Sequence, residues 1–192
     1  MNLESLFRKA ESAGFLDGGS RFLQQRIQGV LGSSGAGPVL RGSWLGHPVH
    51  PVLVSLPIGA WVGATVFDLA FRDHVGARRL IGLGLLATPP TLVTGWADWA
   101  ERDTRQRRVG LIHAEANAIG ITAMLASYLR RRHGSDARAV VTSTAGLLAI
   151  GIGGALGGHL TYAMGAGVDG GAGGSGTGHS HHPGGMKNRG TP

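Results

Sequence analysis

The chain carries four long apolar segments separated by short charged stretches. The segments run over residues 51–71, 80–99, 109–129 and 139–164, and charged residues gather between them at 71–79, 101–108 and 130–138. Each segment has the roughly 20 residues with which an α-helix crosses a hydrocarbon layer about 30 Å thick. Because short connections join antiparallel neighbours, the pattern predicts an all-α fold, an integral membrane four-helix bundle.

A soluble four-helix bundle is the main alternative to this interpretation. Helices on the surface of a soluble protein carry a polar stripe towards water, and the four segments show little of one. Glycine and proline also recur inside the segments, which is more frequent in membrane helices than in soluble ones. The pattern therefore favours a membrane domain over residues 41–168.

The two ends of the chain differ from the middle. Residues 1–40 predict an arm and linker: apolar positions within 2–31 fit two short amphipathic helices broken at residues 17–19, and the Gly/Ser-rich residues 32–38 fit a flexible linker. The arm would lie on the membrane surface, dock on a partner or pack on its own bundle. The glycine-rich residues 169–192 predict a disordered tail. Its motif at 179–182 could collect a metal ion, but it is short and lacks supporting ligands, as is typical of incidental tracts.

Composition narrows the chemistry. The chain has no cysteine, which excludes disulfides, thiolate metal sites and a cysteine nucleophile. The formal net charge of +7 is spread over loops and ends, which points to the anionic headgroups of a lipid bilayer and predicts no nucleic-acid partner. Lys and Arg are nearly balanced between the two sides, but the long arm has no export signal, so we expect both termini in the cytoplasm.

Antiparallel threading brings polar residues from remote parts of the sequence to one face of the membrane. Ionisable groups at that depth are costly and invite a functional interpretation. Within single helices, His113 and Asn117 are four residues apart and His159 and Tyr162 three apart, so each pair shares a helix face. The whole set consists of His47, His50, Asp98, His113, Asn117, His159 and Tyr162.

These residue types suit a metal or a haem. Neutral imidazole is a usual ligand of metal ions and an axial ligand of haem iron, so His50, His113 and His159 are the candidate haem ligands, and His47 joins them as a candidate ligand of a metal ion. Metal-bound imidazoles normally give their other nitrogen to an oxygen acceptor, a role open to Asp98, Asn117 and Tyr162. A glycine-rich stretch beside His159 would leave room for a flat macrocycle; it comprises Gly153, Gly154, Gly157 and Gly158.

Plainer explanations remain open for the same residues. The glycines have the small-residue spacing that lets membrane helices approach closely, and the histidines can form a hydrogen-bonded cluster that only supports packing. Asp68 shares a face of the first segment with His50, five helical turns away, so the two would also suit a proton or ion path. The more ordinary expectation is that Asp68 pairs with Arg79 or Arg72.

Several motifs resemble a known family. Residues 45–61, Thr94-Gly-Trp-Ala-Asp98 and Gly157-Gly-His-Leu-Thr-Tyr162 are similar to the bacterial membrane family catalogued as domain of unknown function 2231, over about residues 41–168. The resemblance implies a four-helix integral membrane domain with no established activity. Some similar proteins carry a Rieske-type iron–sulfur domain after the fourth helix, but this chain has no cysteine there, so such a redox protein would be a separate partner.

Three functions follow as hypotheses for a multi-pass protein of the bacterial inner membrane. In the first, a b-type haem or another His-ligated metal relays electrons between a membrane carrier and a cytoplasmic partner. In the second, the protein is a non-catalytic membrane anchor or scaffold. In the third, it transports protons or ions. The sequence does not settle whether the protein is an enzyme.

Overall fold

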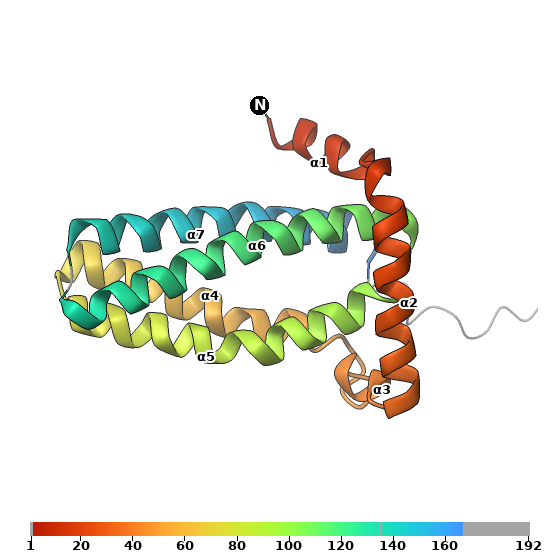
Figure 1. Ribbon diagram of the computed structural model, residues 1–192, viewed down its shortest axis with the longest axis horizontal. Coiled ribbons are helices and arrows are strands. Elements are labelled where there is room, and N and C mark those ends of the chain that lie inside the picture. Colours follow the sequence, from red (N-terminus) through yellow and green to blue (C-terminus); the bar gives the residue numbers. More distant parts are fainter. Residues whose placement is uncertain (1, 135, 167–192) are drawn as a thin grey trace, which may run out of the picture.

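The computed structural model describes residues 2–134 and 136–166 (Figure 1). Four long helices form the body: α4 (His50–Val66), extended by the π-helical turn η2 (Phe67–Phe71), α5 (His74–Trp99), α6 (Thr104–Arg130), and α7 (Ala137–Gly158), extended by the π-helical turn η4 (His159–Ala163). The shorter elements are α1 (Leu3–Glu11), η1 (Gly14–Leu16), α2 (Asp17–Ser34), α3 (Gly37–Leu40) and η3 (Arg131–His133). These residues contain no strand, which confirms the all-α prediction for the described part of the chain.

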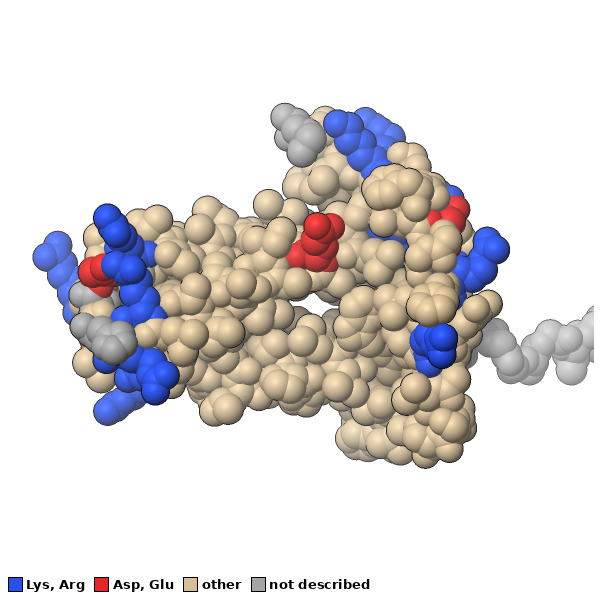
Figure 2. Space-filling model, in the orientation of Figure 1, with Lys and Arg blue, Asp and Glu red and all other residues tan. Residues whose placement is uncertain are grey.

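Four helices are long and apolar enough to cross a membrane: His50–Phe71, His74–Trp99, Thr104–Arg130 and Ala137–Ala163. Lys and Arg gather at the two ends of the molecule and leave a broad band without them (Figure 2), the distribution expected of a membrane-spanning bundle. The second and third spans begin at residues 74 and 104 instead of the predicted 80 and 109. The reason is that the Asp73 and Asp103 carboxylates cap these helices, so charged residues predicted as loops form the first helical turns.

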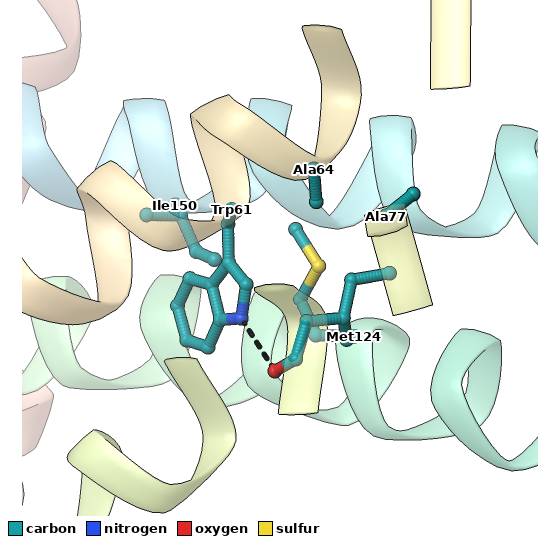
Figure 3. Close-up of a cluster of buried hydrophobic side chains, with 6 residues drawn as sticks. Trp61, Ala64, Ala77, Met124 and Ile150 are labelled. Carbon is teal, nitrogen blue, oxygen red and sulfur yellow. Dashed lines mark hydrogen bonds between the residues drawn. The ribbon is translucent and has the colours of Figure 1, made fainter. Parts of the chain in front are cut away.

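The four spans form two antiparallel hairpins, α4 with α5 and α6 with α7 (Figure 1). The hairpins meet in a buried cluster (Figure 3) made of Trp61, Ala64, Ala77, Ile81, Met124 and Ile150. The Trp61 indole N–H donates to the Ile81 carbonyl at 3.3 Å. A Cβ at Gly84 would lie 2.3 Å from that indole nitrogen, so glycine is needed for α5 to approach α4. This cluster closes the bundle on the side away from the arm.

The arm differs in detail from its prediction. The predicted break at residues 17–19 is wrong, because α1 ends at Glu11 and α2 already begins at Asp17. The turn lies at residues 12–16, most of it in η1. The predicted linker at 32–38 is also wrong, since α2 continues to Ser34, ends at Gly35 with φ of +65°, and is followed by α3.

The arm packs on its own bundle, which is one of the three predicted placements. Ala10 of α1 is buried in a second apolar cluster with Val109 and Leu156. The Arg108 guanidinium donates to both carboxylate oxygens of Asp17, at 2.7 and 2.6 Å. Farther along, α2 crosses the ends of the long helices (Figure 1), and the side chains of Gln24 and Gln28 both donate to the Ala100 carbonyl, at 2.7 and 2.8 Å. The arm therefore covers one end of the bundle.

The predicted disordered tail and the motif at 179–182 lie outside the described residues.

Candidate functional site: a cavity between the hairpins

A cavity of about 500 Å³ lies between the two hairpins at the end that the arm covers. All four long helices contribute to its mostly apolar wall. Figure 2 shows the molecule hollowed between the hairpins. The polar side chains on the wall include His50, Thr91, Asp98, Arg102, His113 and Asn117.

His50 opens α4 and reaches across to α5 of the same hairpin. Its Nδ1 lies 2.9 Å from the Thr91 carbonyl oxygen. Because a carbonyl oxygen only accepts, Nδ1 carries the hydrogen, and in the neutral ring Nε2 then holds a lone pair. Gly95 provides the space for this ring, since a Cβ there would lie 2.8 Å from His50 Cε1.

His113 repeats this arrangement in the second hairpin. Its Nδ1, on α6, lies 2.7 Å from the Gly153 carbonyl oxygen on α7. A Cβ at Gly157 would lie 3.0 Å from His113 Cε1. In both hairpins the glycine that makes room for the ring follows the carbonyl that fixes it by four residues, at 91 and 95 and at 153 and 157. The hairpins thus present two equivalent imidazoles to one cavity.

Asn117 supports His113 without occupying its free nitrogen. The amide Nδ2 donates to the His113 carbonyl at 2.8 Å. It also lies 3.4 Å from Nδ1 and 3.3 Å from Nε2 of the His113 ring. An amide nitrogen almost equally far from both ring nitrogens lies off the lone-pair direction of each, so this contact is weaker than an aligned hydrogen bond. Gly153 makes room for this amide, because a Cβ there would lie 2.6 Å from Nδ2. The His113 Nε2 lone pair is left to the cavity.

Asp98 and Arg102 line the cavity near the end of α5. The Asp98 carboxylate forms no hydrogen bond or ion pair with a described residue. Its oxygens are therefore available to water or to a ligand.

The other predicted site residues lie elsewhere. His47 is exposed in the loop before α4, and Tyr162 reaches the cavity only at its edge, with 90% of its surface exposed. His159 points to the arm: its Nε2 lies 2.6 Å from a Glu11 carboxylate oxygen. The described residues contain no group of three or more His, Asp or Glu side chains placed to hold a metal ion. The four predicted ligands are therefore not assembled into one metal site.

Glu11 is a partner that the sequence did not reveal. Its carboxylate accepts from His159 and from Arg105, and these bonds, that from His159 first, lower the pKa of Glu11. The Phe7 ring stacks on His159 with centroids 4.2 Å apart. The only signal was an acidic residue on an amphipathic arm, and the sequence could not show where that arm docks.

A second polar cluster lies at the opposite end of the bundle. Asp68, in the π-helical turn η2, pairs with Arg131 through two hydrogen bonds of 2.8 and 2.5 Å, and both side chains are 1% exposed. His74 Nδ1 lies 2.8 Å from the same carboxylate, while Ser127 and Ser143 lie within hydrogen-bonding distance of the Arg131 guanidinium. The expected pairing of Asp68 with Arg79 or Arg72 is wrong, because η2 turns Asp68 towards the end of α6 instead of the adjacent loop.

The fold and the distribution of charge define a multi-pass membrane protein with four candidate spans. Residues 46–170, more than half of the chain, match the family model described as Predicted membrane protein (DUF2231). The chain belongs to this family, which confirms the resemblance seen in its motifs. Among curated proteins and among solved structures, none matches this chain.

Proposed function

We propose that the cavity binds one b-type haem, with His50 and His113 as its axial ligands, and that the protein relays electrons. One observation carries this proposal: two imidazoles from separate hairpins line one cavity, each with Nδ1 bonded to a backbone carbonyl. Nε2 of His50 has no described partner, and Nε2 of His113 is approached only by the Asn117 amide, at 3.3 Å. Imidazoles that bind a metal almost always donate their other N–H in this way, which fixes the ring and makes it a better ligand. Neutral histidine is also an established axial ligand of haem iron.

The wall of the cavity fits such a group. Its volume of about 500 Å³ lies within the roughly 300–1,000 Å³ typical of cofactor sites. Gly154 and Gly158 line it without a side chain, and a Cβ at either would meet nothing within 4 Å. Arg102 on the wall can pair with a carboxylate such as a haem propionate.

A haem bound there would supply one-electron chemistry. The chain's own residues would fix the two rings and keep the surroundings apolar, while the Asn117 amide holds the backbone beside His113. In this proposal the protein lies in a bacterial inner membrane with its arm on the cytoplasmic side. It passes electrons from a carrier in the membrane to a separate redox protein on that side. His159 serves the arm in this arrangement, not the haem.

Haem titration of the purified protein in detergent tests the proposal. We expect saturation at one haem per chain, matched by one iron atom per chain in elemental analysis. His50→Ala and His113→Ala should each lower the affinity for haem by at least about 100-fold, so that saturation needs a correspondingly higher haem concentration. The control His47→Ala, which alters an exposed histidine outside the cavity, should bind as the unaltered protein does. Identical titrations for all four proteins, or no binding at all, would refute the proposal.

A scaffold role is the second candidate, and it is favoured by the same two hydrogen bonds. The bonds of His50 to Thr91 and of His113 to Gly153 each join the two helices of one hairpin. If packing is their only role, His113→Ala lowers the thermal stability of the protein in detergent and changes no absorbance or redox property.

A further inference from the structure

Glu115 lies in the middle of the third membrane span. It is 11 residues after the start of α6 at Thr104 and 15 residues before its end at Arg130. With a rise of about 1.5 Å per residue, the carboxylate lies about 17 Å from one end of the span and about 23 Å from the other. Its side chain is exposed on the surface of the bundle.

Nothing described in the chain compensates this carboxylate. Glu115 forms no hydrogen bond or ion pair with any residue that the structure describes. The nearest cation along α6 towards the arm, Arg108, is seven residues away and is bonded to Asp17. Ionisable side chains within the membrane almost always face a protein interior or pair with one another, whereas Glu115 faces outward from this bundle.

The chain has no Lys or Arg at this depth to offer. Residues 50–71, 80–99, 109–129 and 139–163 contain neither residue type. A second copy of the chain would therefore bring no such cation to meet Glu115 within the membrane. Charge complementarity instead requires a different chain whose membrane helix carries a basic side chain.

The surface beside Glu115 suits close approach of a helix. Ala118, Thr122 and Ala126 follow it on the same exposed face of α6, spaced four residues apart. Small residues at this spacing let the backbones of two membrane helices come together. The Thr122 hydroxyl donates to the Ala118 carbonyl of its own helix. The Glu115 carboxylate is therefore the polar group on this face that still needs a partner.

We propose that this face of α6 binds a transmembrane helix of another protein, and that Glu115 forms an ion pair with a Lys or Arg on that helix at the same depth. The ion pair neutralises a charge that lipid cannot solvate, and the small residues allow the two helices to lie close enough to form it. The inference does not depend on whether the cavity binds haem.

Energy transfer in lipid vesicles tests this inference with the full chain. Because the chain has no cysteine, a single Arg132→Cys at an exposed position takes one donor fluorophore. The probe is an acceptor-labelled synthetic leucine–alanine transmembrane helix with one central Lys, compared with the same helix carrying Leu instead. We expect association with the Lys helix alone and roughly tenfold weaker association after Glu115→Gln.

A matched control moves the carboxylate to another span at the same depth. Ile152 is 51% exposed and lies 11 residues from the arm-side end of its span, as Glu115 does. The double variant Glu115→Leu/Ile152→Glu should bind the Lys helix about as weakly as Glu115→Gln. Equal binding by this variant and the unaltered protein would overturn the proposal, since any lipid-exposed carboxylate would then suffice.

Two other outcomes would also overturn it. Energy transfer between donor- and acceptor-labelled copies of the protein, lost in Glu115→Gln, would assign the face to a second copy. A lower melting temperature of Glu115→Gln in detergent, without any added helix, would assign Glu115 a role within the bundle itself.

Discussion

The membrane bundle holds ionisable side chains near both ends, and the two groups are bonded in opposite ways. At the end away from the arm, here called the closed end, Asp68 and Arg131 bind each other through two hydrogen bonds and are almost fully buried. At the end that holds the cavity, here called the open end, His50 and His113 each bond a backbone carbonyl through Nδ1 and line the cavity, with only the Asn117 amide near Nε2 of His113. A buried ion pair whose partners satisfy each other supports the fold, whereas imidazoles with an uncommitted nitrogen beside a cavity are suited to bind something.

The largest effect is expected at the closed end. Arg131→Leu leaves the Asp68 carboxylate buried without its main partner, which should lower the free energy of unfolding by about 3–5 kcal/mol. Denaturant unfolding in detergent measures this loss. The double variant Asp68→Leu/Arg131→Leu removes both charges and should recover most of it. If the single variant unfolds like the unaltered protein, the closed end does not have the structural role assigned to it.

Substitution of the cavity histidines should have the reverse effect, a large loss of haem affinity and a small loss of stability. His113→Ala should lower the affinity for haem by at least about 100-fold, because loss of a group behind a metal ligand alone has a roughly 10–100-fold effect. The same variant should lower the free energy of unfolding by only about 1 kcal/mol, the value of one hydrogen bond. Haem titration and denaturant unfolding of the same preparation separate the two effects. A large loss of stability with unchanged haem affinity would make the open end structural as well.

The glycines behind the rings offer a finer test. Gly157→Ala places a Cβ about 3.0 Å from the His113 ring, which should displace the imidazole and weaken haem binding by about tenfold. Gly151→Ala is the matched control in the same helix, because its Cβ would meet nothing within 4 Å and the residue does not line the cavity. Equal haem affinity of the two variants, measured by titration, would show that the position of the ring does not matter.

The smallest effect concerns the arm and depends on pH. Because hydrogen bonds from His159 and Arg105 lower the pKa of Glu11, its contribution to docking is present above about pH 4.3, the ordinary pKa of a glutamate. The contribution, about 1 kcal/mol, is lost as the pH falls through the lowered value. Fluorescence anisotropy of a label at Ser5→Cys should report a freer arm in acid.

Glu11→Gln provides the control for this titration. The variant cannot ionise, so its label should show no such step. A step that persists in Glu11→Gln would assign the pH dependence to another group.

The sequence predicted the spans well because long apolar runs leave few alternatives to membrane helices. Antiparallel threading also brought His50, Asp98, His113 and Asn117 to the wall of one cavity. It failed for His159, because the partner Glu11 lies on an arm whose docking depends on tertiary packing. The partner of Asp68 was also predicted wrongly, because a π-helical turn redirects that carboxylate and no periodicity in the sequence predicts such a turn.

Glu115 was overlooked for a different reason. It is the one acidic residue in the third apolar segment, so the signal was present in the sequence. Its meaning depends on whether the side chain faces the interior or the lipid, and only the packing of α6 against its neighbours decides that.

The reduced absorbance spectrum of the haem-loaded protein, recorded before and after addition of carbon monoxide, tests the central claim most directly. In the proposed arrangement, His50 and His113 would both hold the iron and leave it no open position. We therefore predict the spectrum of a six-coordinate low-spin haem that carbon monoxide leaves unchanged, and a carbon monoxide-binding spectrum in His50→Ala or His113→Ala. A protein that takes up no haem, or whose haem binds carbon monoxide without either substitution, would contradict the account.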